Sequence, residues 1–209
     1  GVNNTNVFSV AEDITKSLDP ANGSIQKLYS EDTNLNVFQE LKVSRALIDK
    51  DAIYSAEGGG TPVRSFTTVI GQIVPYLGKY GISQNPESFA IYGYNKYFAD
   101  MNNNAILKLS QSGIDEISSI GMRDYFRDTI NKINSLGTTG DIFGGWDIYS
   151  KQYTIKMQES RFSKFNQSYF QTLTFDDSIK GWTSFFSYNP SQLFSVRNEF
   201  FTTTGGKLY

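Results

Sequence analysis

The chain has 209 residues, which suggests one domain or two small ones, and that length can bury a core without covalent or metal staples. It contains no cysteine and no histidine, which excludes disulfide scaffolds, thiolate chemistry, Cys/His zinc sites and triads that need an imidazole base. Charges of both signs are mixed and the net charge is −2, so there is no basic stripe for nucleic acid and no polybasic membrane patch. No apolar run approaches transmembrane length.

Aromatic residues make up 15% of the sequence, in a background rich in Ser, Thr and Asn. Such a composition favours strands over helices. We therefore expect a mainly β protein.

Residues 1–33 are polar and contain Pro20 and Gly23, which break any long element, so they predict an extended arm or the end of a preceding unit. A β domain is expected over residues 34–209. Its first apolar runs are separated by polar turns and predict an antiparallel meander; they are Leu35–Phe38, Val43–Ile48 and Ala52–Tyr54. A glycine-rich loop is expected over 57–64, and the apolar run 69–77 cannot be a regular helix because Gly71 and Pro75 interrupt it.

The next stretch predicts three strands joined by tight turns, at residues 96–99, 105–109 and 114–117. Asp100 and Asn102–Asn104 suit a hairpin tip, because Asn and Asp tolerate left-handed backbone conformations.

One amphipathic helix interrupts the β pattern, over about residues 121–136. Its apolar residues recur with a helical period and form a single stripe; they are Met122, Tyr125, Phe126, Ile130, Ile133 and Leu136. Gly137 is placed just beyond its end. The opposite face carries charged residues and is expected to be solvated.

The C-terminal part predicts further strands. Tyr153, Ile155 and Met157 alternate with Thr154 and Lys156, which is typical of a half-buried strand. The remaining strands are expected at 146–149, 173–175, 182–188 and 199–203, with turns at Gly144-Gly145, at Asp176–Lys180 and at Gly205-Gly206.

A weak internal repeat joins these segments. Val37-Phe38, Tyr97-Phe98 and Phe200-Phe201 each precede a polar turn and another apolar segment, and their spacing fits units of about 50 residues once one unrecognised unit is allowed. Four-stranded units of that size are typical of propeller blades. The sequence predicts propeller-like antiparallel blades with one inserted helix, and a two-sheet sandwich is the alternative.

The two ends suggest a fragment of a longer chain. The sequence opens at Gly1 without methionine, which indicates processing or trimming, and Gly205-Gly206 before Lys207–Tyr209 indicates that it stops partway through a β unit. Tight C-terminal processing is the alternative.

No catalytic, cofactor-binding or metal-binding residue emerges. Asp100-x-Asn102-x-Asn104 opens like a calcium loop, but Ala105 stands where glycine is required and Gln111 where the bidentate glutamate is required. The adjacent carboxylates Asp115-Glu116 and Asp176-Asp177 point to opposite faces of a strand. The glycine clusters Gly58–Gly60, Gly144-Gly145 and Gly205-Gly206 lack the Lys-Ser/Thr of a phosphate loop, so we interpret them as turns. Trp146 and Trp182 are expected to pack in the core or between blades, although sugar stacking is an alternative.

Three blocks of the sequence resemble large virion structural proteins of tailed phages, including tail nozzle, muzzle or stabilising proteins of crAss-like and marine phages. The first block consists of 85–90, 96–100, 105–110 and 121–126, the second of 141–147 and 153–155, and the third of 173–175, 181–188, 198–201 and 206–209. The resemblance spans roughly residues 25–209, and the aromatic spacing of the third block is its most specific part.

The resemblance implies a non-enzymatic structural protein of the virion, in the tail, nozzle or connector assembly. It also implies propeller-like folds packed in a symmetric homo-oligomeric ring. We expect other tail and portal-adaptor proteins as partners, non-specific contact with passing DNA, and no membrane partner. It carries over no catalytic residue and no cofactor. A receptor- or glycan-binding tail module is the alternative function, and a glycoside-cleaving enzyme would need two carboxylates converging in one cleft.

Overall fold

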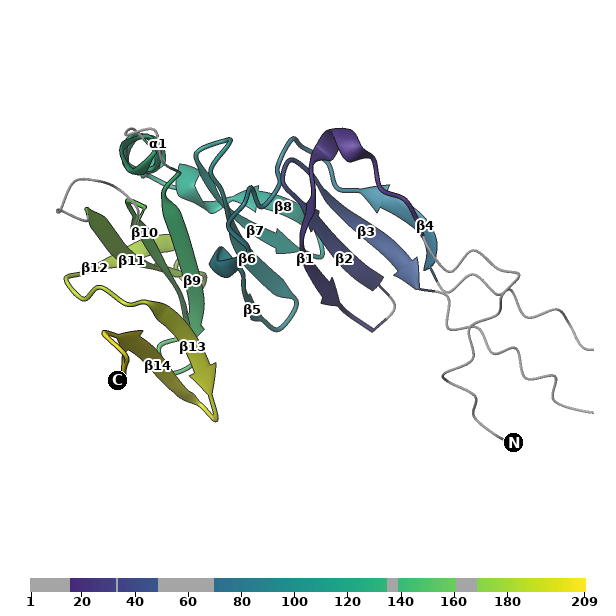
Figure 1. Cartoon of the computed structure of the whole chain (residues 1–209). Coiled ribbons are helices and arrows are strands. Elements are labelled where there is room, and N and C mark those ends of the chain that lie inside the picture. Colours follow the sequence, from purple (N-terminus) through teal and green to yellow (C-terminus); the bar gives the residue numbers. More distant parts are fainter. Residues whose placement is uncertain (1–15, 33, 49–69, 135–138, 161–168) are drawn as a thin grey trace, which may run out of the picture.

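The computed structural model describes residues 16–32, 34–48, 70–134, 139–160 and 169–209. Within them the chain is mainly β, as its composition predicts, with strands in four antiparallel sheets and one α-helix. Each sheet is a meander, because consecutive strands are hydrogen-bonded neighbours. In Figure 1 the first sheet lies at the right, the second in the centre and the third at the left. Neither a closed barrel nor a complete propeller is identified among the described residues, so the propeller-like arrangement of the sheets stays a prediction.

The first sheet contains β1 (Ile25–Ser30), β2 (Asn34–Gln39), β3 (Val43–Ile48) and β4 (Ile70–Pro75). The second contains β5 (Ala90–Tyr92), β6 (Asn95–Asp100), β7 (Ala105–Ser110) and β8 (Gly113–Glu116). The third contains β9 (Asp141–Asp147), β10 (Gln152–Gln158), β11 (Phe170–Asp176) and β12 (Gly181–Phe186). The fourth contains β13 (Gln192–Val196), β14 (Glu199–Thr204) and β15 (Lys207–Leu208).

Most strands predicted from the sequence are present. The expected runs at 35–38 and 43–48 are β2 and β3, the three central strands are β6 to β8, and four C-terminal ones are β10, β11, β12 and β14. The strand expected at 146–149 is wrong in its second half, because β9 ends at Asp147 and residues 148–149 form a turn. Within the apolar run at 69–77, residues 70–75 form a strand, β4, and not a helix. The predictions for Ala52–Tyr54, the loop at 57–64 and Gly137 lie outside the described residues.

The expectation of an arm or preceding unit over residues 1–33 is wrong for its last part. Residues 25–30 form β1, which pairs antiparallel with β2 and opens the first sheet. The apolar residues Ile25 and Leu28 are three positions apart and not on alternate positions, so the sequence of β1 lacks the alternation that would have predicted a strand. Both side chains are 51% exposed.

The second sheet is buried on both faces. Lys96, Phe98, Leu107 and Leu109 point to the first sheet, where Phe98 and the two leucines pack against Phe38 and Val43. Because side chains alternate along a strand, the residues between them point the other way, toward the third sheet. These are Tyr97, Ala99, Ile106 and Lys108.

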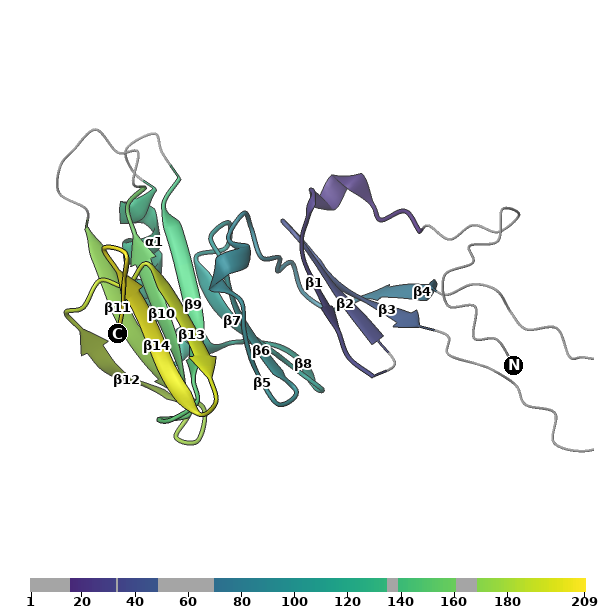
Figure 2. The ribbon, with the colours of Figure 1, turned by 60° about the horizontal axis from the view of Figure 1, so that its bottom comes forward.

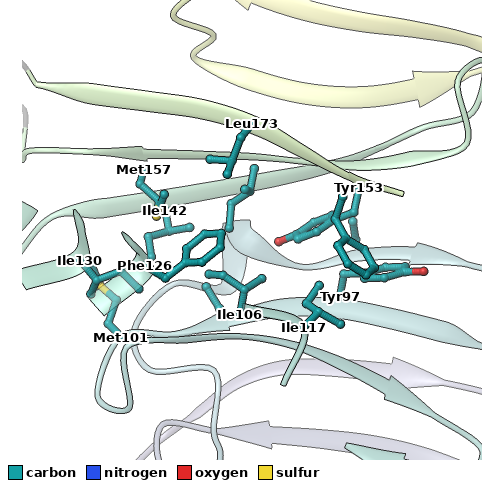
Figure 3. Close-up of a cluster of buried hydrophobic side chains, with 14 of the residues drawn as sticks. Tyr97, Met101, Ile106, Ile117, Phe126, Ile130, Ile142, Tyr153, Met157 and Leu173 are labelled. Atoms are coloured by element: carbon teal, nitrogen blue, oxygen red, sulfur yellow. The ribbon is translucent and has the colours of Figure 1, made fainter. Parts of the chain in front are cut away.

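The interface between the second and third sheets forms the larger core (Figure 3). In Figure 3, Ile106 and Ile117 from the second sheet and its following turn face Leu173 and Met157 from the third. All four are at most 2% exposed. Complete burial of one such side chain stabilises a fold by about 2 kcal/mol.

The predicted helix is present as α1 (Arg123–Ile133), which connects the second sheet to the third. Phe126, Ile130 and Ile133 are buried in the larger core, so the apolar stripe read from the sequence is the packed face. The charged face is exposed, as expected. No helix in the described part of the chain is long and apolar enough to cross a lipid bilayer.

The fourth sheet lies against the third through β13 and β9 (Figure 2). The Ser195 hydroxyl donates to the Trp146 carbonyl and accepts a hydrogen bond from the Ile148 amide at 3.2 Å. The predicted turn at Gly205-Gly206 joins β14 to β15, and both glycines have positive φ.

A short connector, residues 81–83 between β4 and β5, links the first sheet to the second. The amides of Ile82 and Ser83 donate to the carbonyls of Gln39 and Glu40 at the β2–β3 turn, each at 3.0 Å. On its other side, the connector donates to the buried Asp100 carboxylate, from the Gly81 amide at 3.0 Å and the Ser83 hydroxyl at 3.1 Å.

A second connector, residues 85–88 just before β5, links the second sheet to the third. The Ser88 hydroxyl accepts from the Ala99 amide at 3.0 Å, and the Ser88 carbonyl accepts from the Tyr153 hydroxyl at 2.6 Å. The Asn85 side-chain oxygen accepts from the Ile142 amide at 3.2 Å. The polar groups of the connectors therefore reach into both sheets that they join.

Replacing Asp100 with alanine is expected to lower the free energy of unfolding by about 3 kcal/mol, because buried donors of the first connector lose their acceptor. Urea denaturation followed by tryptophan fluorescence measures the change. The exposed Asp115→Ala is the matched control and is expected to change it by less than about 0.5 kcal/mol. Equal losses in the two variants would contradict the role given to Asp100.

Candidate functional site

The calcium-like stretch at Asp100 is a hairpin turn, as predicted. Besides the two connector donors, the Asp100 carboxylate accepts hydrogen bonds from the amides of Asn102 and Asn103 at 2.9 and 3.2 Å, and from the Asn103 side chain at 2.7 Å. These donors occupy the lone pairs that a cation would need. The described residues contain no group of three or more Asp and Glu able to hold a metal ion.

The adjacent carboxylates do not form acid/base pairs. Asp177 accepts from Lys108 at 2.8 Å, while Asp176 accepts from the amide and hydroxyl of Ser178 at the turn. The Ser178 donors hold the pKa of Asp176 below its ordinary value. Glu116 accepts from the Tyr80 hydroxyl at 3.1 Å. Each of these carboxylates has a structural partner instead of a facing carboxylate.

The prediction of a turn at Gly144-Gly145 is wrong, because both glycines lie inside β9. Their neighbours approach too closely for a side chain. A Cβ on Gly144 would lie 2.2 Å from the Ser88 carbonyl oxygen, and one on Gly145 would lie 2.6 Å from the Cβ of Leu193 in β13. The pair therefore lets the third sheet meet the second connector on one face and the fourth sheet on the other. The cluster Gly58–Gly60 lies outside the described residues.

The two tryptophans pack inside, as predicted. Trp146 is 7% exposed, and the Trp182 ring packs against Phe126 while its Nε1 donates to the Ile117 carbonyl at 3.0 Å. Neither ring forms an open platform for a sugar.

Four aromatic rings interleave between the second and third sheets. Tyr92 stacks on Trp146 with ring centroids 4.5 Å apart, Trp146 on Tyr97 at 5.4 Å, and Tyr97 on Tyr153 at 5.1 Å. The rings come alternately from the two sheets, which prevents one sheet from sliding past the other without unstacking them. Burial raises the pKa of Tyr97 and Tyr153.

No protein-family model and no curated protein matches the chain.

The first strands of the four sheets line one pocket of about 580 Å³. Tyr29 contributes from β1, residues 90–93 from β5 and the turn after it, 144–146 from β9 and 193–195 from β13. We call it the first-strand pocket. Strands far apart in the sequence thus meet at one place, each at the same position in its own sheet.

A second pocket, of about 1020 Å³, contains a residue whose environment the sequence did not reveal. Lys156 was expected on the solvent side of a half-buried strand, yet it is only 3% exposed, and Thr154 beside it is 1% exposed. The segment leading to the fourth sheet covers this face, since the Lys156 Nζ donates to the Pro190 carbonyl at 2.6 Å. Strand alternation alone gives no sign of such a cover.

Replacing Gly145 with alanine is expected to lower the free energy of unfolding by about 2 kcal/mol, because the added methyl group overpacks the contact with Leu193. Chemical denaturation measures the loss. Gly181→Ala is the matched control on β12: the nearest atom lies 3.9 Å from its added Cβ, and little change is expected. A tolerated Gly145→Ala would show that the contact between β9 and β13 is not tight.

Stability is expected to rise with pH above about 8 and to fall above about 10. Burial lowers the pKa of Lys156 to about 8 despite attraction to Asp141, so in this window the unfolded chain binds more protons than the folded one. This group alone raises the free energy of unfolding by about 2 to 3 kcal/mol. Above this pH window the stability falls as the pH rises. Burial raises the pKa of Tyr125 and Tyr188 to about 12, so the unfolded chain loses the tyrosine protons at a lower pH than the folded chain.

Urea titrations at a series of pH values test this. Lys156→Met should remove the rise and keep the fall, since the tyrosines are unchanged. A rise that persists in the variant would assign it to other groups.

Proposed function

We propose that the chain is a non-enzymatic structural component of a phage virion, in the tail, nozzle or connector assembly, and that its sheets are propeller-like blades. The observation that carries the proposal is the series of meander sheets packed face to face, with their first strands meeting at the first-strand pocket.

The arrangement of the sheets supports the propeller-like assignment. Propeller blades are four-stranded meanders arranged around a central channel. The first three sheets have that strand number and order, and β1, β5, β9 and β13 lie together at the first-strand pocket. A two-sheet sandwich does not account for a central sheet that is covered on both faces by other sheets.

Rigidity is the mechanical property that these contacts supply. Each face of the second sheet combines apolar packing with an ion pair to its neighbour, Lys96 to Glu31 in the first sheet and Lys108 to Asp177 after β11 in the third. Lys96 is 3% exposed, so a small shift of the sheets that breaks its ion pair before water enters would leave a buried charge unpaired. Relative displacement of the sheets is therefore costly.

The proposed partners are other virion proteins of the tail and portal-adaptor region, together with further copies of the chain in a symmetric ring. The exposed charged face of α1 supplies one contact surface, with Asp124, Arg127 and Asp128 side by side. The near-neutral charge of the chain suits a wall past which DNA slides, because few phosphates would be neutralised.

A glycan-binding tail module has less support. It would present open aromatic platforms, whereas Trp146 is buried and Trp182 is packed against Phe126. A glycan array tests this alternative, and a specific, saturable hit would favour it over the scaffold.

Electron microscopy of purified virions tests the proposal directly. We expect to trace the four sheets in density as repeated copies around the tail axis, with β9 packed against β13. Mass spectrometry of the same particles should detect the chain in multiple copies per virion. Finding the protein only free in infected cells, and never in particles, would overturn the proposal.

A further inference from the structure

The larger pocket lies where the third and fourth sheets meet. Phe143 and Lys156 form part of its floor on the third sheet, Phe194 and Lys207 belong to the fourth sheet, and Lys27 on β1 reaches it from the first. Residues from three sheets therefore surround one open volume of about 1020 Å³.

The pocket has an excess of positive charge in a chain that is net negative. Lys27, Lys156 and Lys207 line it, against one carboxylate, Glu87. Lys156 forms no ion pair in the described part of the chain, and its ammonium makes one hydrogen bond, to the Pro190 carbonyl. Two of its three N–H donors are left for another acceptor. An ammonium buried in this way is costly without an anionic partner.

Aromatic rings stand beside the lysines. The Lys156 Nζ lies 5.4 Å from the centre of the Phe143 ring, and the Lys27 Nζ lies 5.1 Å from that of Phe89. The Phe194 ring, 36% exposed, completes the apolar part of the wall. The pocket thus offers donors for an oxyanion next to flat surfaces for an apolar group.

We propose that this pocket binds an aromatic carboxylate, with the carboxylate on Lys156 and the ring against Phe143 and Phe194. Such a group comes from a free small molecule or from the carboxyl-terminal aromatic residue of another chain. The bound carboxylate accepts charge-assisted hydrogen bonds from the unused N–H groups of the Lys156 ammonium in a sheltered site. The inference goes beyond the structural role proposed above and does not depend on it.

Nuclear magnetic resonance of the isotope-labelled full chain tests the proposal, with benzoate as the probe. We expect a saturable shift of the Lys156 side-chain signals and an upward shift of its titration midpoint, because an anion favours the charged amine. Acetate should bind about tenfold more weakly, since it lacks the ring, and this ratio corresponds to about 1.4 kcal/mol. Benzamide, which keeps the ring and loses the charge, should not bind measurably.

Variants separate the pocket from other lysines. Lys156→Met removes the ammonium but keeps an unbranched apolar side chain, and it should abolish benzoate binding, whereas Lys79→Met, at an exposed lysine outside the pocket, should leave it unchanged. Lys27→Gln, at the opposite wall, should weaken binding by about threefold to tenfold while the amide spectrum stays that of the folded protein.

Tighter binding of N-acetylphenylalanine than of benzoate would indicate a chain terminus as the natural source, and the reverse order would indicate a free small molecule. Unchanged benzoate binding in Lys156→Met, or equal binding of benzoate and benzamide, overturns the proposal. Either result leaves the virion assignment untouched, since that assignment is tested on particles.

Discussion

Burial of the second sheet on both faces is the constraint on which the rest of the structure depends. A strand directs alternate side chains to opposite faces, so each strand of this sheet must satisfy two neighbours at once. In β6, Phe98 and Lys96 point to the first sheet, while Tyr97 and Ala99 point to the third. A shift of one residue in register would exchange the two sets, and each buried lysine would lose its carboxylate. The positions of the first and third sheets follow from that register.

The connectors carry this order between sheets by pairing most of their buried polar groups, although the Asn85 side-chain nitrogen is buried without a hydrogen-bond partner. A turn between packed sheets has backbone donors that water cannot reach, and each needs an acceptor. Asp100 provides acceptors for the first connector and Ser88 provides both an acceptor and a donor for the second. Ser83 adopts a left-handed conformation, with φ of 53°, and its hydroxyl accepts the Met101 amide at 2.7 Å, which offsets the strain. Small polar residues thus fix the spacing of large apolar surfaces.

The sequence predicted the elements that carry a strong pattern and missed those whose pattern depends on distant neighbours. The repeated pairs Val37-Phe38, Tyr97-Phe98 and Phe200-Phe201 all lie on the second strand of a sheet, in β2, β6 and β14. In the third sheet that strand is β10, where Thr154 follows Tyr153, so the repeat is hidden there. The glycines of β9 resemble a turn in the sequence because the close approach of Ser88 and Leu193 is not a local property. The same holds for the cover over Lys156.

The repeat is hidden in the third sheet because the two faces of that sheet contact different kinds of neighbour. The second and third sheets meet through apolar and aromatic side chains, whereas the covered face of the third sheet presents Thr154, Lys156, Thr172 and Thr174. The Thr172 hydroxyl donates to the Tyr188 carbonyl at 3.0 Å, so this face is held by hydrogen bonds to a crossing segment. A small displacement costs more free energy at directional hydrogen bonds beside a cavity than at close apolar packing. The reason is that each buried donor left unpaired costs about 1 to 3 kcal/mol. The fourth sheet is therefore held by hydrogen bonds from Lys156 and Thr172 together with the close contact between Gly145 and Leu193, whereas the first three sheets hold one another through larger apolar cores.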